Sequence, residues 1–220
     1  MIQPRESAMS QLTSNIALEN SVIAQDWAGA VRLTFRQGEE IYAQDEDADL
    51  IYRVICGSVR TAHLQADGRR QIGDFYYEGD IIGVEVGETR RFSAEALSVC
   101  EVLALRRAGS AAYETGRVER MIWAATASEL QRTQSHMLLL GRATACEKVA
   151  RFLMDIAKRF KGEFVILPMS RQDMADYLGL TIETISRMLG RLQADGVIEF
   201  SGSRKYRVRR PGCLSELAAA

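Results

Sequence analysis

The sequence predicts an α+β protein in three successive parts: an antiparallel β-sandwich or barrel, a long helix and a winged helix-turn-helix. Short β-rich runs separated by glycine turns occupy residues 31–107, which is typical of a sandwich or barrel. A run of helix formers without glycine or proline follows over residues 118–140. Two short helices and a hairpin are then expected near the C-terminus. We expect the three parts to span residues 1–112, 113–142 and 143–220.

The composition is that of an ordinary globular protein, with 47% hydrophobic and 26% charged residues. No apolar stretch approaches the ~18 residues that a membrane span needs, and the polar N-terminus lacks the apolar core of a signal peptide. These observations predict a cytoplasmic protein without membrane contact. Residues 143–220 contain 13 Lys and Arg against 9 Asp and Glu, whereas residues 1–142 contain 15 against 20. A basic C-terminal part favours binding to a polyanion such as nucleic acid.

The N-terminal part begins with residues 1–25, which lack a clear periodicity and are expected to form a flexible lead-in or a short helix. The β-rich runs that follow combine β-branched and aromatic residues and are bounded by turn formers. Asp67-Gly68, between two such runs, is the strongest hairpin signal. The runs are VRLTF at 31–35, DLIYRVICGSV at 49–59, RRQIGDFYY at 69–77 and VCEVLALR at 99–106.

The long helix carries two apolar rows. One row alternates by four and three residues, as in a coiled-coil seam, and we expect it to pair with a second copy of the chain. The second row is expected to pack on the helix's own domain. Burial of the whole helix inside a monomer is the alternative. The predicted dimer seam is Trp123, Ala127, Leu130, Gln134 and Met137, and the second row includes Val118, Ile122, Ala125 and Leu139.

The segment after the long helix contains its own start and stop signals. Gly141 is expected to end the long helix. Thr144 and Glu147 form a capping box that starts the next helix, whose apolar positions follow at helical spacing. Residues 164–167 are then expected to form a short strand.

A helix-turn-helix is predicted from three residues. Ser170 is placed to cap a first helix, Gly179 permits a tight turn, and Thr181 is placed to cap a second helix. Two β-rich runs at 196–200 and 205–210 are separated by a polar turn and predict a hairpin, so the unit is expected to be winged. The expected buried positions are Met174, Ala175 and Leu178 in the first helix and Ile185, Met188, Leu189 and Leu192 in the second.

The outward face of the second helix predicts sequence-specific binding to DNA. Glu183, Ser186 and Arg187 lie at positions i, i+3 and i+4, so they share one side of its first turns. Arginine suits guanine O6 and N7, glutamate accepts from cytosine N4, and Ile182 fits against a thymine methyl group. An ion pair between Glu183 and Arg187 on a solvated surface is the alternative. Candidate phosphate contacts are Ser170, Arg171, Thr181, Thr184, Arg191 and Lys205.

These motifs resemble the Crp/Fnr superfamily of bacterial transcription regulators over about residues 28–210. The shared stretches are IYRVICGSV at 51–59, EGDIIG at 78–83 and LGLTIETISR at 178–187. The last stretch is similar to the FixK branch, in which an E-x-x-S-R pattern reads a TTGA half-site.

The resemblance implies a β-roll like that of cyclic-nucleotide-binding domains, and a homodimer that acts as an activator on double-stranded DNA. By motif, Glu183, Ser186 and Arg187 read TTGA-N6-TCAA palindromes. The resemblance also implies a contact with RNA polymerase through the loops at residues 83–91.

The chain departs from the effector-binding members of that superfamily. Residues 1–50 contain no cysteine, unlike the oxygen sensors that hold an iron–sulfur cluster. In the cyclic-nucleotide cassette, Phe92 stands where an arginine for the phosphate is expected, and Gln134 replaces a serine beside the position that meets the base. For a heme, the chain offers His63 and His136. We expect no cofactor and no metal, with control by a cyclic nucleotide or a heme as alternatives.

The cysteines and the C-terminus leave further alternatives open. Cys56, Cys100, Cys146 and Cys213 contain no C-x-x-C pair and are expected to be reduced thiols, although one of them as a redox sensor is an alternative. Residues 216–220, ELAAA, resemble the tails that bacterial ATP-dependent proteases recognise, and a frayed end is the alternative.

Two other classes of protein are less consistent with the sequence. Catalysis at a cupin-like metal site is not expected, because His63 stands alone in the β-rich part without a second histidine at metal-ligand spacing. A sensor that binds only proteins, with a vestigial helix-turn-helix, conflicts with the intact caps, turn and recognition face.

Overall fold

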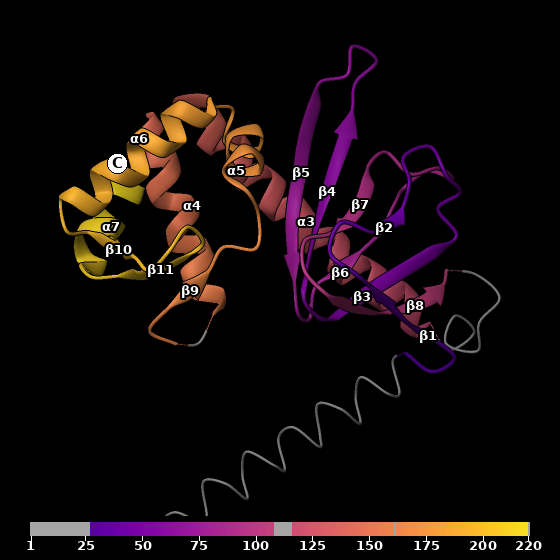
Figure 1. Ribbon diagram of the computed structural model, residues 1–220. Coiled ribbons are helices and arrows are strands. Elements are labelled where there is room, and N and C mark those ends of the chain that lie inside the picture. Colours follow the sequence, from indigo (N-terminus) through magenta and orange to yellow (C-terminus); the bar gives the residue numbers. More distant parts are fainter. Residues whose placement is uncertain (1–26, 108–115, 161, 220) are drawn as a thin grey trace, which may run out of the picture.

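The computed structural model of the chain describes residues 27–107, 116–160 and 162–219. A β-domain (residues 27–107), a long helix and a C-terminal domain (residues 144–219) follow one another along the chain (Figure 1). The expected lead-in at residues 1–25 lies outside the described residues. In those described ranges no helix is both long enough and apolar enough to cross a membrane.

The β-domain consists of two four-stranded antiparallel sheets with an apolar core. Val54, Val59, Ala94, Cys100 and Val102 have no exposed surface. This confirms the antiparallel β-domain predicted from the sequence. In spatial order, the first sheet is β1 (Val31–Phe35), β8 (Cys100–Arg106), β3 (Leu50–Cys56) and β6 (Ile81–Ile82), and the second is β2 (Glu40–Tyr42), β7 (Ser93–Ala96), β4 (Ser58–Leu64) and β5 (Arg70–Tyr77).

Strands β4 and β5 form a hairpin that extends beyond the rest of the β-domain (Figure 1). Its turn is the predicted Asp67-Gly68, where Gly68 adopts a φ of 83° that side chains rarely tolerate. The Gln65 N–H donates to the Arg69 carbonyl at 2.8 Å and closes the hairpin. The register pairs Leu64 with Arg70 next to the turn and shifts by one residue between Thr61 and Ala62.

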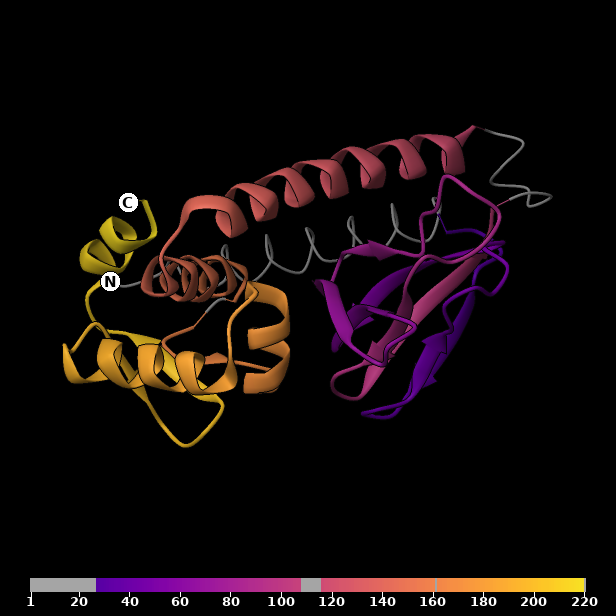
Figure 2. The ribbon, with the colours of Figure 1, turned by 90° about the horizontal axis from the view of Figure 1, so that it is seen from above.

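Helix α3 (Arg117–Arg142) runs along both domains (Figure 2). At its start Val118 is fully buried against Trp27, Ile51 and Leu105 of the β-domain. The expected end at Gly141 is wrong by one residue, because the glycine stays in the last helical turn. Ala143 is the first extended residue, with φ −72° and ψ 140°.

The predicted capping box opens helix α4 (Ala145–Arg159). The Glu147 N–H donates to Thr144 Oγ1 at 3.4 Å, and the Thr144 N–H donates to Glu147 Oε2 at 2.8 Å. Two backbone groups that the helix itself cannot pair are thereby satisfied. The box separates α4 from α3 and sets the point where the C-terminal domain begins.

The C-terminal domain is a winged helix-turn-helix, as predicted. Its core includes Leu153, Leu178, Ile185, Leu192 and Tyr206, each at most 1% exposed. The sheet has the order β10-β11-β9, and the predicted hairpin is β10 with β11. The elements after α4 are β9 (Val165–Ile166), α5 (Arg171–Leu178), α6 (Ile182–Ala194), β10 (Ile198–Phe200), β11 (Lys205–Val208) and α7 (Pro211–Ala219).

Helix α7 was not expected from the sequence, where this segment is treated as a tail. Leu214 is 1% exposed and anchors the helix in the same core as α4. Proline suits the first helical position, because its missing N–H has no partner there in any case. A frayed end, the alternative for residues 216–220, is therefore wrong for residues 216–219, and Ala220 lies outside the described residues.

Candidate DNA-binding surface

The helix-turn-helix is held by the predicted capping residues. The Asp173 N–H donates to Ser170 Oγ at 3.1 Å at the start of α5, and the Thr184 N–H donates to Thr181 Oγ1 at 3.2 Å at the start of α6. Gly179 ends α5 with φ 61° and ψ 42°, a left-handed conformation that glycine adopts without strain. The two helix caps and the left-handed glycine fix the turn that packs α6 against α5.

Helix α6 has one buried face and one exposed face. Ile185, Met188, Leu189 and Leu192 are at most 9% exposed and pack into the core, as predicted. The residues expected to read bases lie on the other side: Ile182 is 37% exposed, Glu183 and Arg187 are exposed, and Ser186 is half-buried.

The charges of this face do not neutralise each other. Among the ion pairs of the described residues, none joins Glu183 to Arg187, so the surface ion pair that was the alternative is absent there. The backbone N–H of Glu183 and the Thr181 hydroxyl lower the pKa of the Glu183 carboxyl, which keeps it ionised. Arg171 Nη1 donates to Ser186 Oγ at 3.2 Å and so reaches the same face from α5. The face presents a donor and an acceptor, which a guanine–cytosine pair can satisfy.

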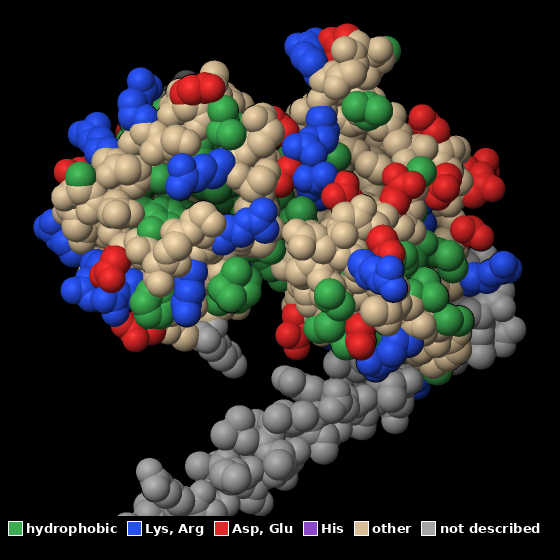
Figure 3. All heavy atoms as spheres, viewed as in Figure 1, with side chains coloured by type: hydrophobic (Ala, Val, Ile, Leu, Met, Phe, Trp, Pro, Cys, Tyr) green, Lys and Arg blue, Asp and Glu red, His purple; other side chains and the backbone are tan. Residues whose placement is uncertain are grey.

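The surroundings of α6 are basic. Figure 3 shows Lys and Arg side chains spread over the C-terminal domain, while acidic side chains gather on the outer side of the β-domain. This matches the positive balance of charge in residues 143–220. Such a surface favours contact with a phosphate backbone.

The expected phosphate contacts have different surroundings. Ser170 and Thr181 use their hydroxyls as helix caps, and Thr184 Oγ1 accepts from Thr181 at 3.2 Å. Arg191 forms an exposed ion pair with Asp195 at 3.7 Å.

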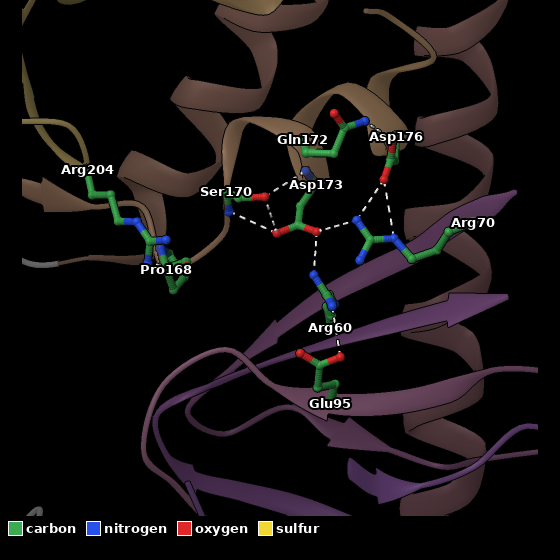
Figure 4. A network of polar contacts seen from close by, with 9 residues as sticks. All are labelled: Arg60, Arg70, Glu95, Pro168, Ser170, Gln172, Asp173, Asp176 and Arg204. Carbon is green, nitrogen blue, oxygen red and sulfur yellow. Dashed lines mark hydrogen bonds and ion pairs between the residues drawn. The ribbon is translucent and has the colours of Figure 1, made fainter. Parts of the chain in front are cut away.

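The wing also carries an exposed cation, Arg204, that was not among the expected phosphate contacts. Lys205 Nζ lies 4.6 Å from the centre of the Phe164 ring. Its neighbour Arg204 is exposed, and Arg204 Nη1 donates to the Pro168 carbonyl at 3.4 Å, just before α5 (Figure 4). The signal was available, because Arg204 lies in the turn of the predicted hairpin beside Lys205.

The predicted dimer seam lies on an exposed face of α3. The helix itself runs along both domains (Figure 2). Trp123, Leu130 and Met137 are 77%, 58% and 65% exposed, and Ala127 and Gln134 are exposed as well. In the second row, Val118 is buried, and Ile122, Ala125 and Leu139 are half-buried on the side of their own chain. The helix therefore presents an apolar stripe, interrupted by Gln134, that the described residues of this chain leave uncovered.

The interior of the β-domain near residues 83–94 is filled by the chain's own side chains. Arg90 is 1% exposed; its guanidinium donates to the carbonyls of Gly83 and Leu50 and lies 4.4 Å from the centre of the Tyr42 ring. Phe92 packs so closely on Gly73 that a Cβ there would come within 2.9 Å of its ring.

The neighbouring Arg91 points outwards. Its side chain is 72% exposed and forms an ion pair with Glu85 at 3.0 Å. Glu85 and Arg91 of this segment are therefore paired with each other.

Both histidines are hydrogen-bonded to backbone carbonyls, and the cysteines range from the exposed Cys56 to the buried Cys100. His63 Nδ1 lies 2.9 Å from the Arg91 carbonyl, and His136 Nε2 donates to the Tyr177 carbonyl at 2.8 Å. The four cysteines are free, and burial raises the pKa of Cys100 to about 12. Across residues 27–107, 116–160 and 162–219, no three His, Cys, Asp or Glu side chains are arranged to hold a metal ion.

A β-roll joined through a long helix to a winged helix-turn-helix defines a two-domain DNA-binding regulator. Residues 32–111 match the family model of the cyclic nucleotide-binding domain, and residues 167–198 match that of bacterial regulatory proteins of the crp family.

Related proteins extend over most of the chain. The nitrogen fixation regulation protein FixK of Azorhizobium caulinodans is 44% identical over 191 residues, which cover 83% of this chain and 77% of that protein. The transcriptional activatory protein AadR of Rhodopseudomonas palustris is 40% identical over 190 residues, covering 83% and 79%. The structure of FixK2 from Bradyrhizobium japonicum has a TM-score of 0.81 at 45% identity and covers 87% of this chain and 98% of that chain. This chain belongs to the Crp/Fnr family of transcription regulators, in its FixK branch.

Proposed function

We propose that the protein is a homodimeric transcription activator that binds TTGA-N6-TCAA palindromes, with Glu183 and Arg187 reading a guanine–cytosine pair in each half-site. The observation that carries the proposal is the exposed face of α6, on which these two side chains stand one turn apart. Ser186 and Ile182 complete the face, and the relative named a transcriptional activatory protein supports activation. Because the proposed target is DNA, the protein is proposed to act in the cytoplasm.

The exposed stripe on α3 supports the proposed dimer. Pairing two stripes removes Trp123, Leu130 and Met137 from water, and each fully buried side chain of this size contributes about 1.5–3 kcal/mol. The pairing is two-fold, so it presents two α6 helices to the two halves of a palindrome. In TTGA-N6-TCAA the half-site centres are about 10 base pairs apart, which is one turn of DNA.

We further propose that DNA binding requires no small-molecule effector. The support is the β-domain interior, where Arg90 and Phe92 occupy the segment that forms the nucleotide cassette in cyclic-nucleotide-binding relatives. A nucleotide would have to displace a buried guanidinium that already donates to two carbonyls and stacks on Tyr42. Breaking such contacts without replacing them is costly.

Two partners beyond DNA belong to the same proposal. The loops at residues 83–91 include Val86, which is 93% exposed, and they are the surface proposed to touch RNA polymerase. The C-terminal residues 216–220 are proposed to serve as a recognition signal for an ATP-dependent protease. Because α7 is anchored by Leu214, its last turn must unwind before a protease can engage it.

Titration of the effector-free protein in air tests the proposal. A labelled TTGA-N6-TCAA duplex and a scrambled duplex are compared by fluorescence anisotropy, with and without cyclic AMP. Tight and selective binding without the nucleotide is expected. Binding only with cyclic AMP would refute the effector-free part, and equal binding to both duplexes would refute the assigned half-site.

A further inference from the structure

An arginine–carboxylate cluster joins the β4–β5 hairpin to the first helix of the helix-turn-helix (Figure 4). Arg70 Nη2 lies 2.7 Å from Asp173 Oδ1 and 2.7 Å from Asp176 Oδ2, and Arg60 Nη1 also donates to Asp173 Oδ1. Behind them, Arg60 Nη2 pairs with Glu95 Oε2 of β7 at 2.8 Å. Charged residues far apart in sequence thus connect two domains at one place.

The cluster is largely removed from water. The side chains of Asp173 and Arg60 are 3% and 13% exposed, and those of Asp176 and Arg70 are 17% and 30% exposed. Exposed ion pairs contribute little, but breaking a buried pair leaves an uncompensated charge in a poorly solvated place. Moving the C-terminal domain away from the β-domain would break the charge-assisted hydrogen bonds from Arg60 and Arg70 to Asp173, so the cluster favours the docked arrangement.

Asp173 divides its two oxygens between two tasks. Its Oδ2 accepts from the Ser170 N–H at 2.9 Å and the Ser170 hydroxyl at 2.7 Å, which completes the capping box of α5. Its Oδ1 accepts from Arg60 and Arg70. The Asp173 carboxylate that caps α5 also binds the two arginines of the hairpin, so the hairpin holds α5 by its N-terminal end.

The other end of α5 is held as well. The Tyr177 ring stacks on His136 of α3 at a centroid distance of 3.9 Å and contacts Phe75 of β5 at 5.2 Å. With both ends fixed, α5 has a defined direction relative to the β-domain and to α3. Helix α6 shares its buried core with α5, so its direction is defined too.

We propose that Arg60, Arg70 and Asp173 are positioning residues that set the angle of α6, and so the spacing at which the dimer reads its two half-sites. This inference rests on the proposed function, because the angle matters only if α6 reads DNA. The ion-pair cluster takes the place of an effector: it holds the two domains in the DNA-reading arrangement from the time the chain folds.

The experiment compares the full-length R60Q and R70Q variants with the wild type and with R69Q. Glutamine removes the charge but keeps hydrogen-bonding groups. Arg69 is the matched control, because it lies in the same hairpin and pairs with Asp67, and these two side chains are 77% and 51% exposed. Affinity is measured on TTGA–TCAA duplexes with spacers of five, six and seven base pairs. Each base pair shifts a half-site by about 3.4 Å and turns it by about 35°.

The wild type and R69Q are expected to prefer the six-base-pair spacer strongly. R60Q and R70Q should lose at least about fivefold of their affinity for that duplex, as expected for the loss of one coupling between domains. Their preference over the other two spacers should shrink, because a released domain can follow a displaced half-site. An unchanged preference in R60Q and R70Q, or an equal loss on all three duplexes, would overturn the inference.

A DNA-free measurement separates this inference from the proposed function. Failure of the wild type to bind any of the duplexes would refute the proposed function alone. Small-angle X-ray scattering of the free protein is then decisive: R60Q and R70Q should have a larger radius of gyration than the wild type and R69Q, and identical curves would refute the cluster's role. Should R60Q fail to fold, R70Q and D176N carry the same test, since the amide introduced by D176N still offers Gln172 a hydrogen-bond acceptor.

Discussion

Replacement of Arg187 by alanine is expected to weaken binding to the palindrome strongly while leaving the fold intact. The side chain is exposed on α6, and no ion pair among the described residues includes it, so its removal breaks no internal contact of that kind. The stability of the protein should change by less than about 0.5 kcal/mol. A good bidentate contact between arginine and guanine contributes about 1–3 kcal/mol of discrimination.

The dimer doubles this cost. The two half-sites lie about 34 Å apart, so the two losses should add, to about 2–6 kcal/mol per dimer. At about 1.4 kcal/mol for each factor of ten, the affinity for the palindrome should fall at least ~30-fold. The loss should vanish on a duplex in which the guanine–cytosine pair of each half-site is replaced by adenine–thymine.

Fluorescence anisotropy on the palindrome, the substituted duplex and a scrambled duplex measures this difference. Circular dichroism of the variant checks that helix content and melting temperature are unchanged. An equal loss on all three duplexes would show that Arg187 only adds positive charge near the backbone. That result would refute its assignment as a base-reading residue.

Three further predictions concern the seam, the wing and α3. Leu130→Glu should raise the dimer dissociation constant at least ~10-fold in analytical ultracentrifugation, because an apolar side chain that contributes about 1.5–3 kcal/mol when buried is replaced by a charge that faces its own copy; a dimer as tight as the wild type would contradict the seam. Arg204→Ala should reduce the slope of log affinity against log salt by about 0.9 for each half-site, and an unchanged slope would exclude a phosphate contact. Burial lowers the pKa of His136 below its usual 6.5, because the charged imidazolium is poorly solvated in the folded protein. The neutral ring therefore favours the folded state, and its contribution to stability is complete above pH 6.5. The melting temperature should therefore decline as the pH falls below about 6.5, and His136→Gln should make this decline shallower, whereas an identical decline in both proteins would contradict the assignment.

Local signals made the helix-turn-helix readable from the sequence. The capping hydroxyls of Ser170 and Thr181 and the glycine at 179 act within a few residues, so their spacing in the sequence is their spacing in the structure. The Asp67-Gly68 turn was predicted for the same reason. The face of α6 followed directly, because helical periodicity decides which residues share a side.

Features that depend on distant segments were not predictable. In the sequence, Asp173 is an ordinary polar residue in the first turn of α5, and only the folded structure brings Arg60 and Arg70 to it. Arg90 stands beside a second arginine in a turn-rich segment, yet packing places it and not Arg91 in the interior. Helix α7 was missed because its apolar anchor depends on the core that α4 supplies.

In the proposed dimer, the exposed apolar stripe on α3 makes occupancy of a promoter a steep function of how much protein is present. Below the dimer dissociation constant most chains are single, so halving their amount lowers the concentration of dimers about fourfold. Modest changes in synthesis or turnover would then produce large changes in transcription, which is the form of control that the proposed effector-free binding requires. The area of one helix face, with Trp123, Leu130 and Met137 on it, sets the abundance at which the response begins.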